Sequence, residues 1–428
     1  MRWFKSFEPN FAADFAAFLA HSRGSPANVD AVVASVIDAV RRDGSAAVAR
    51  LSAEFDGFAL TEATMRVSTG EIEAGAALCP AEVREALRFA AARISDYHRR
   101  QLPADTRYTD PTGIELGWRW RPIAAVGIYV PGGRAAYPST VLMNSVPARI
   151  AGVERIAMAT PPGRLEPAVL AAALEAGVTE IWRIGGAQAI AALAFGAGPL
   201  EKVDKIVGPG NAYVTAAKRR LYGVVGLDSL AGPSEIVVVA DAANDPAWIA
   251  ADLLSQAEHD PDAQSILITN DEAFAGLVCE SLHAQLLTLA TREVAAAAWR
   301  AHGAVIIAPL DRAPELVNMI APEHVEFAVD DPEALADKVD HAGAIFLGRH
   351  APEAIGDYTA GANHILPTSG AARFSSGLSV LDFLKRTSVV KADAEGFAAL
   401  AGPTMVLAEA EGLPAHARSV SVRIDRRG

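Results

Sequence analysis

The chain has 428 residues, of which 51% are hydrophobic and 21% are charged, and its formal net charge is −13. A chain of this length buries a large core and is expected to form at least two domains. The acidic balance and the lack of a basic block exclude nucleic acid and anionic membrane surfaces as expected partners.

The first quarter of the chain predicts helices. Residues 1–25 place acids and a lysine among apolar residues and lack the continuous apolar region of a signal peptide, so we interpret them as a helical arm. Residues 28–103 carry apolar residues at helical spacing, with glycine stops. No apolar run reaches membrane-spanning length, so we expect a soluble protein.

The two cysteines, Cys79 and Cys279, are far apart, and neither lies in a C-x-x-C pair. They exclude a disulfide scaffold and disfavour a zinc ribbon. Each thiol is expected to pack as a small hydrophobe, which fits a reducing cytoplasm.

From about residue 122, short apolar runs alternate with alanine-rich helical segments, and a second such series spans residues 246–347. This alternation predicts an α/β fold with parallel sheets that are covered on both faces. Residues 356–390 are rich in glycine, serine and threonine and predict a long irregular segment, a kind that is usually functional or disordered. The tail 393–428 predicts helix.

Four glycine loops come next to predicted strands: GIYVPGGR, RIGGAQA, IVGPGNAY and LAGPSE. Ligands of open α/β sheets collect outside the carboxyl ends of strands, where glycines let backbone N–H groups approach a phosphate. None of the loops has the G-x-G-x-x-G pattern, because Tyr213 stands where a glycine is required. Each loop alone is compatible with a tight turn, but the four together favour a binding face of unknown ligand.

The helix predicted over residues 246–259 ends with Gln256 and His259, three positions apart and therefore on one helical face. One interpretation is a polar helix end that faces water. The other is half of a metal site, which requires further ligands from elsewhere in the chain.

Glu323 and His324 are adjacent in APEHVEF, where Pro322 is expected to hold Ala321 in extended geometry within a rigid turn. Histidine suits proton transfer near neutral pH, and glutamate can orient a water molecule. The alternative is a surface acid–imidazole pair.

Two more polar clusters stand towards the C-terminus: Asp357 with Asn363 and His364 in one loop, and Glu411 with His416 in EAEGLPAH. Turn residues and an exposed terminal helix are the alternatives. Zinc takes nitrogen, oxygen and sulfur ligands, and without a thiolate cluster or an H-E-x-x-H motif it would need histidine and carboxylate here.

Taken together, ten segments resemble the histidinol dehydrogenase family, in order and across nearly the whole chain: GIYVPGG, MNSVPARIAGV, GGAQAIAALAFG, VDKIVGPGNAYV, AGPSEI, LLSQAEHDPDAQ, APEHVE, GDYTAGANHILPT, DFLKR and EAEGLPAH. The resemblance implies a zinc- and NAD-dependent enzyme of histidine biosynthesis. Such an enzyme oxidises L-histidinol to L-histidine in two hydride transfers, through a bound aldehyde, as the last stage of the pathway.

The resemblance also implies roles for particular residues. Zinc would be held by Gln256, His259, Asp357 and His416, and these ligands also contact the substrate. Glu323 and His324 would be the catalytic pair, with His324 as the general base and Glu323 activating water for the second oxidation; both also bind the substrate.

Further positions that match the family concern substrate and cofactor. Ser234, His364 and Glu411 would contact the substrate, with His364 and Glu411 reaching across from the partner subunit. Tyr129, Gln188 and Asn211 would contact the dinucleotide. In the family the tail comes from the neighbouring subunit, so the resemblance implies a homodimer with shared sites.

The domain organisation implied is a helical arm (1–25), a discontinuous first α/β domain (26–125 plus 237–375), an inserted Rossmann-like domain (126–236) and a C-terminal arm that crosses to the partner (376–428). Three alternatives to the full activity stay open: an NAD-dependent dehydrogenase of another small alcohol, a zinc hydrolase without dinucleotide, and a non-catalytic metal-binding protein. The presence of His364 and Glu411 favours histidinol.

Overall fold

The computed structural model describes residues 1–22, 29–132, 137–230 and 232–424. Its internal contacts divide the chain into two compact units, one of residues 1–101 with 124–383 and one of residues 102–123 with 384–428. The two units are described separately below.

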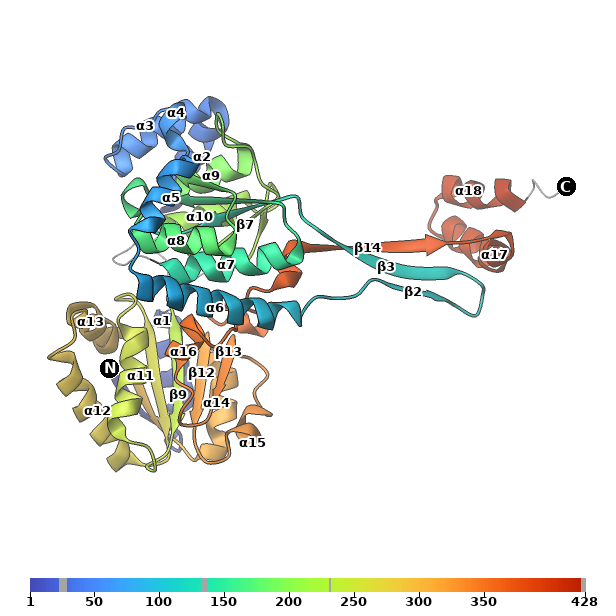
Figure 1. The fold of residues 1–428 in the computed structure, drawn as a ribbon. Helices are drawn as coiled ribbons and strands as arrows, with labels where there is room; N and C mark the ends of the chain where they lie inside the picture. The colour runs from blue at the N-terminus through green and yellow to red at the C-terminus, as the bar shows by residue number, and fades with distance from the viewer. Residues whose placement is uncertain (23–28, 133–136, 231, 425–428) are drawn as a thin grey trace. The chain divides into compact units, whose positions relative to one another are not determined.

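A six-stranded parallel sheet, in the order β1-β11-β10-β9-β12-β13, forms one part of the first unit (Figure 1). Its inner strands are rich in Val and Ile and buried on both faces, as parallel strands under helical layers must be. The strands are β1 (Arg2–Lys5), β9 (Glu235–Ala240), β10 (Gln264–Thr269), β11 (Ala304–Ile307), β12 (His324–Ala328) and β13 (Ala344–Leu347).

Alternating residues of β9 pack into two different cores, one on each face of this sheet. Ile236 and Val238 join the core of α11, α12 and α13, whereas Val237 and Val239 join the core of α1 and α14. The helices are α1 (Phe11–Ser22), α11 (Pro246–Ala257), α12 (Glu272–Leu286), α13 (Arg292–His302), α14 (Ala313–Ile320), α15 (Pro332–Ala336) and α16 (Glu353–Tyr358).

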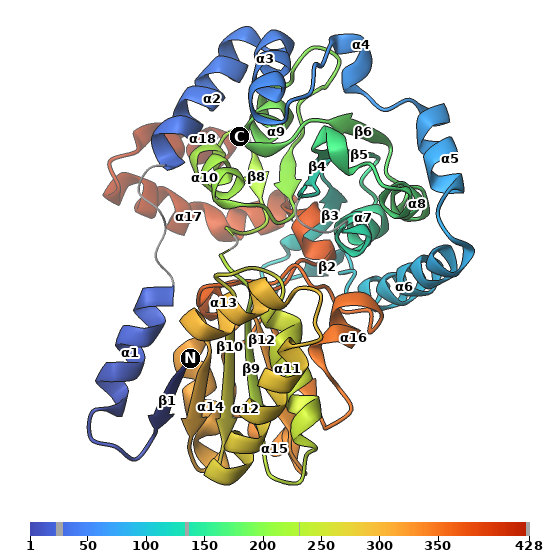
Figure 2. The same cartoon turned by 90° about the vertical axis from the view of Figure 1, so that its left-hand side faces the viewer.

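The N-terminal segment differs from the purely helical arm predicted for residues 1–25. It starts with β1, which pairs in parallel with β11, and only then forms α1 (Figure 2). The strand is four residues long and its partner is about three hundred residues away in the chain, so no local pattern could reveal it.

A five-stranded parallel sheet, in the order β6-β5-β4-β7-β8, forms the other part of the first unit. The chain runs outward from β4 to one side through β5 and β6, and to the other side through β7 and β8. The strand order therefore reverses between β4 and β7, which creates a crevice at their carboxyl ends. The strands are β4 (Ala125–Tyr129), β5 (Arg155–Thr160), β6 (Glu180–Arg183), β7 (Lys205–Val207) and β8 (Gly226–Leu227).

Two groups of helices surround this second sheet. The helices between its strands are α7 (Pro138–Ala151), α8 (Pro167–Ala176), α9 (Gly186–Phe195) and α10 (Ala212–Leu221). Against them pack the N-terminal helices α2 (Val29–Asp43), α3 (Ser45–Phe55), α4 (Glu62–Met65), α5 (Thr69–Ala77) and α6 (Ala81–Arg99).

The helix-rich character predicted for residues 28–103 is therefore confirmed where the structure describes it. Val33 and Val48 share one core with Trp182 and Ile190, so this segment packs on the five-stranded sheet, whereas the sequence interpretation had grouped it with the other sheet. The division of the chain into domains remains an interpretation.

The second unit is built on an antiparallel sheet in the order β14-β3-β2, followed by two helices. Part of β14 lies in the segment 356–390 that the sequence analysis expected to be irregular. It pairs with β3, in a register that runs from Leu384 opposite Pro122 to Lys391 opposite Glu115. The partners are so far apart in the chain that local patterns do not reveal the pairing. The elements are β2 (Thr106–Thr109), β3 (Glu115–Pro122), β14 (Leu384–Lys391), α17 (Ala394–Ala410) and α18 (Pro414–Ile424).

Two parallel sheets with helical cover confirm the predicted α/β class. Within the described ranges, none of the helices is long and apolar enough to cross a membrane.

Candidate functional site

The adjacent residues Glu323 and His324 lie at the amino end of β12, beside the start of β9. A hydrogen bond of 3.0 Å from the backbone N–H of Glu235 to Oε2 of Glu323 joins the two strands. Nδ1 of His324 lies 3.1 Å from the carbonyl oxygen of Glu235. Both side chains are buried, so the pair is part of the interior, and the interpretation as a surface acid–imidazole pair is wrong.

The turn before this pair differs from the expectation. Ala321 is not extended but left-handed, with φ 51°, and its N–H caps α14 by donating to the carbonyl of Val317. A left-handed alanine before proline is strained, and such strain is often found next to functional residues. Glu323 follows this turn directly, and its carboxylate lies in the site.

The end of α11 brings Gln256 to the same place. Its side chain is 1% exposed. One end of its amide lies 3.1 Å from Oε1 of Glu353 and 3.3 Å from the Glu235 carbonyl, and because both partners are acceptors, this end is the amide nitrogen. The amide oxygen is then turned the other way, 3.5 Å from Nδ1 of His259. The pair predicted from helical spacing is thus brought together, with the oxygen of Gln256 available to a cation.

Asp357, at the end of α16, lies among three imidazoles. Its carboxylate oxygens are 4.0 Å from Nε2 of His259 and 3.8 Å from Nε2 of His324. Its backbone carbonyl is 3.0 Å from Nδ1 of His364. His364 therefore lies beside Asp357 of its own chain, and the expectation that it reaches across from the partner subunit is wrong. The structure therefore gathers side chains from α11, β12, α16 and the following loop, which are far apart in the sequence.

These groups fit a divalent metal ion. Nε2 of His324 is buried and has no hydrogen-bond partner among the described residues, so a ligand or ion is needed to satisfy it. One ligand atom each of His324, Glu353 and Asp357 lies within 4.8 Å of the others. This set shares only Asp357 with the zinc ligands implied by the resemblance.

Burial sets the protonation states of the cluster. It lowers the pKa of His324 to about 4, although the nearby Asp357 carboxylate acts in the opposite direction. It also lowers the pKa of His364, and it raises the pKa of Glu323 and of Glu353 well above the ordinary carboxyl value. At neutral pH His324 is an uncharged imidazole, the form that can accept a proton or bind a metal ion.

Ser234 lies directly before β9, next to the Glu323–His324 pair in the sheet. Its carbonyl accepts the N–H of Gln264, which fixes the backbone at the start of β9 and β10. The N–H of Ser369 donates to Oε1 of Glu235 over 3.2 Å, so the loop after His364 is tied to the same edge of the sheet. Residues 232–235 of the LAGPSE motif are therefore near the amino ends of β9 and β10 and not at their carboxyl ends.

Tyr129, Gln188 and Asn211 lie at the carboxyl ends of the other sheet. The hydroxyl of Tyr129 accepts the N–H of Gly186 at the start of α9, over 2.9 Å. Asn211 caps α10 by accepting the N–H groups of Tyr213 and Val214. These contacts place the loops after β4, β6 and β7 around the crevice that the strand order creates.

The loop after β7 is locked in place. Gly208 has φ 107°, and a Cβ atom there would lie 2.3 Å from the carbonyl oxygen of Tyr129, so only glycine fits. Its N–H and carbonyl bind Asp228 and Lys218, which form an ion pair of 2.6 Å with side chains 4% and 3% exposed. The end of β7 is thereby held against the end of β4.

Glu411 and His416 belong to the second unit. Glu411 is the C-cap of α17, and the N–H of His416 donates to the carbonyl of Leu413 in the first turn of α18. Both residues are exposed in the described chain. Their assignment to the site stays a prediction.

The sequence analysis missed three acids behind the site: the buried Glu326 and Glu353, and the partly buried Asp252. Glu353 accepts the hydroxyl of Ser255 at 3.2 Å, and its backbone N–H donates to Glu326. Asp252 and Gln256 are four residues apart on α11, as are Glu353 and Asp357 on α16. The helical spacing that revealed Gln256 and His259 could also have indicated these acids.

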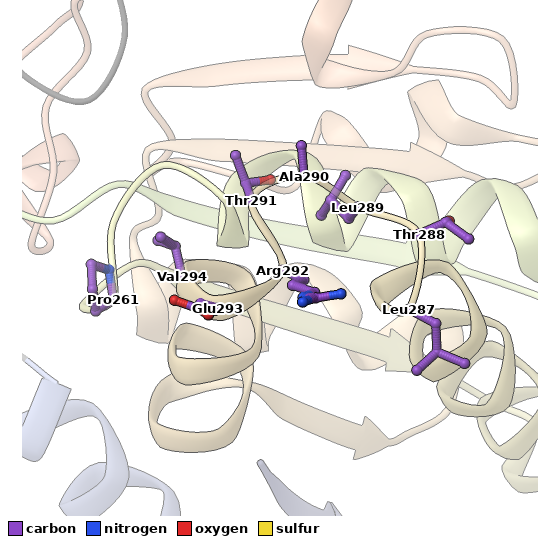
Figure 3. A pocket seen from close by; sticks show the side chains of 9 residues that line it. All are labelled: Pro261, Leu287, Thr288, Leu289, Ala290, Thr291, Arg292, Glu293 and Val294. Atoms are coloured by element: carbon purple, nitrogen blue, oxygen red, sulfur yellow. The ribbon is translucent and has the colours of Figure 1, made fainter.

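A hollow on the surface of the first unit, lined by Pro261 and residues 287–294 between α12 and α13, is shown in Figure 3. None of the residues predicted for the site lines it. The buried cluster around His324 is the better candidate, because it holds the perturbed titratable groups.

Fold and site together define an α/β enzyme that combines a dinucleotide-type sheet with a buried imidazole–carboxylate cluster. Comparisons with known proteins agree. The profile of the family described as histidinol dehydrogenase matches residues 19–424, and the chain belongs to this family of oxidoreductases.

Similar proteins cover essentially the whole chain. The histidinol dehydrogenase of Caulobacter vibrioides is 70% identical over 424 residues, 99% of each chain. That of Rhodopseudomonas palustris is 56% identical over 98% of each chain. The crystal structure of histidinol dehydrogenase from Elizabethkingia anophelis is 36% identical, covers 100% of this chain and 98% of its own, and superimposes with a TM-score of 0.93.

Proposed function

We propose that this protein oxidises L-histidinol to L-histidine through bound L-histidinaldehyde, with one zinc ion per subunit and two NAD, as the last stage of histidine biosynthesis. The observation that carries the proposal is the convergence of Glu323, His324, Gln256, His259 and Asp357 in one cluster of a family member.

Gln256, His259 and Asp357 of one chain, with His416 of the partner chain, are the proposed zinc ligands. The donor set of amide oxygen, imidazole and carboxylate suits zinc in a site without thiolates. When bound, the ion would supply orientation, by fixing the amino alcohol relative to the catalytic pair.

His324 is the proposed general base of the first oxidation. It takes the hydroxyl proton of the alcohol at Nε2 while the hydride leaves the carbon for NAD. Its Nδ1 lies 3.1 Å from the Glu235 carbonyl and 3.1 Å from the Gln256 amide, which fix the orientation of the ring, and Nε2 has no hydrogen-bond partner among the described residues.

Glu323 is the proposed activator of water in the second oxidation. Water adds to the aldehyde carbonyl, and loss of hydride from the hydrate to the second NAD gives the carboxylic acid. Burial and the neighbouring Glu235 and Asp357 raise the pKa of Glu323, which makes it a stronger base in its ionised form. Ser234, His364 and the partner's tail residue Glu411 would bind the polar groups of the substrate.

The five-stranded sheet is the proposed dinucleotide site. Its reversed strand order supports this, and so does the gathering of Tyr129, Gln188 and Asn211 around the crevice. The close approach of Gly208 to β4 replaces the usual G-x-G-x-x-G turn as the tight contact of this loop.

A homodimer with exchanged tails is the proposed assembly, in the cytoplasm. Val390, Val406 and Leu407 of the second unit are 64–68% exposed, and such apolar exposure favours a subunit interface.

The test is a reaction of the purified protein with L-histidinol and NAD. Two NADH per histidinol are expected, with loss of activity on chelation and recovery with zinc. One NADH with released aldehyde would contradict the four-electron reaction. Activity only with other small alcohols would favour a related dehydrogenase, and absence of NAD binding would favour a zinc hydrolase.

A further inference from the structure

The order of the five-stranded sheet indicates where each half of a dinucleotide lies. In sheets of this topology the pyrophosphate lies at the end of the first strand, and an acid after the second strand binds the hydroxyls of the adenosine ribose. The first strand here is β4 and the second is β5. The residues after β5 are Pro161, Pro162 and Gly163, so this stretch offers no acid.

A carboxylate reaches this place from outside the sheet. Asp56 is the C-cap residue of α3. A Cβ atom on Gly185, in the loop after β6, would lie 2.9 Å from Cγ of Pro161 and 3.1 Å from Oδ1 of Asp56. The carboxylate of Asp56 and the end of β5 therefore flank the same point of the glycine loop.

Asp56 is also bound to a residue of the proposed cofactor face. The amide nitrogen of Gln188 donates to Oδ2 of Asp56 over 3.2 Å. Gln188 is buried, whereas Asp56 is exposed, so the carboxylate is anchored on one side and open to solvent on the other.

No cation of the described chain neutralises this carboxylate. Partial burial raises the pKa of Asp56, and the only opposing influence is the hydrogen bond from Gln188. Arg183, at the end of β6, is occupied by the carbonyls of Thr64 and Arg66 and by the carboxylate of Glu71. The site thus presents a free negative charge, which accepts hydrogen bonds from hydroxyls and repels a phosphate.

We propose that Asp56 binds the adenosine ribose hydroxyls of the dinucleotide and excludes cofactors that carry a 2′-phosphate. The inference rests on the proposed function, because it takes the five-stranded sheet as the NAD site. It adds a specificity residue from the helical segment before the sheet, where the sequence analysis expected none.

The experiment compares Asp56→Asn with the parent protein, using L-histidinol with NAD or NADP. Loss of the charged acceptor is expected to raise the KM for NAD about tenfold while kcat changes little. The ratio of kcat/KM for NAD to kcat/KM for NADP is expected to fall about tenfold. Calorimetric titration with NADH and NADPH measures the same preference without turnover.

Two further variants separate the proposal from simpler explanations. Glu54→Gln removes an equal charge from the exposed side of the same helix and should leave both KM values unchanged. Gln188→Ala removes the anchor of Asp56 and should weaken NAD and NADP binding to a similar degree, because it removes no charge.

The outcomes separate a failure of the proposal on Asp56 from a failure of the proposed function. If the parent protein uses NAD while Asp56→Asn keeps the parental KM and cofactor preference, the inference on Asp56 is overturned. It is also overturned if Asp56→Asn weakens both cofactors alike, since Asp56 then only positions Gln188. If the parent protein forms no NADH and binds none, the proposed function itself fails.

Discussion

Burial governs the ionisation of the single side chains around β12. A neutral His324 and carboxyls of raised pKa result from desolvation, which is the largest influence on the pKa of each group. The same acids that support the site therefore reduce the stability of the fold at high pH, and the effect is measurable at Asp252.

Asp252→Asn should stabilise the protein at pH 8 and not at pH 4. Burial raises the pKa of Asp252 from 3.8 to about 6, beside Glu326, to which it is hydrogen-bonded. Between pH 3.8 and about pH 6 the folded chain holds a proton that the unfolded chain releases. The free energy of unfolding therefore falls as the pH rises through this window. The gain at pH 8 should be about 1 kcal/mol, because the two acids titrate together.

Thermal unfolding at pH 4, 6 and 8 measures this difference. Glu280→Gln, on the exposed face of α12, is the matched control and should show no such pH dependence. A gain from Asp252→Asn that is equal at all three pH values would show that the carboxyl is ionised throughout.

His324→Ala should lower kcat by at least about a hundredfold, because it removes the general base. It should leave zinc bound, since the proposed ligands are intact in this variant. Elemental analysis of the purified variant decides the matter, with Asp357→Ala as the comparison that should lose metal. Loss of zinc from His324→Ala would favour the alternative ligand set of His324, Glu353 and Asp357.

Some helices and strands of this chain can be recognised from local residue patterns, whereas others are stabilised by partners far away in the sequence. The alternation of strands and helices in both parallel sheets follows from local apolar patterns and was predicted, whereas β12, which begins at His324, was interpreted as a turn. The elements β1, β2, β3 and β14 were missed, because their stability comes from partners far away in the chain.

The N-terminal element shows how much such a remote contact contributes. Phe15 of α1 is fully buried, stacks with Phe11 and packs edge-to-face against Phe4 of β1. Phe15→Ala should lower the free energy of unfolding by about 3–5 kcal/mol through lost burial and the remaining cavity.

The matched control is Phe7→Ala in the turn between β1 and α1, where the side chain is 69% exposed. This change should stay within about 0.5 kcal/mol in chemical denaturation. Similar losses for both variants would mean that α1 is not docked on the sheet in solution.

The assembled protein is expected to complete its site with a tail from a second copy. The described chain alone gathers Gln256, His259 and Asp357, whereas Glu411 and His416 lie in the separate second unit. A dimer with exchanged tails predicts that two defective chains can restore each other.

Co-expression of Asp357→Ala chains with His416→Ala chains should restore about a quarter of the parental activity. Half of the dimers then contain both chains, and one of the two sites in each is intact. The pair His416→Ala with Glu411→Ala should show no recovery, because both changes lie in the tail. Absence of recovery in the first pair would mean that each tail serves its own chain.

The sequence by itself determined the α/β class, most elements of the two parallel sheets, and the pairs Gln256–His259 and Glu323–His324, because these depend on spacing within one helix or one turn. Tertiary structure alone decided that Glu353 and Asp56 join the candidate sites and that Ala321 is left-handed. It also decided that the N-terminal strand completes a sheet edge. Each of these depends on contacts between segments that are far apart in the chain, and a local pattern of residues does not predict such contacts.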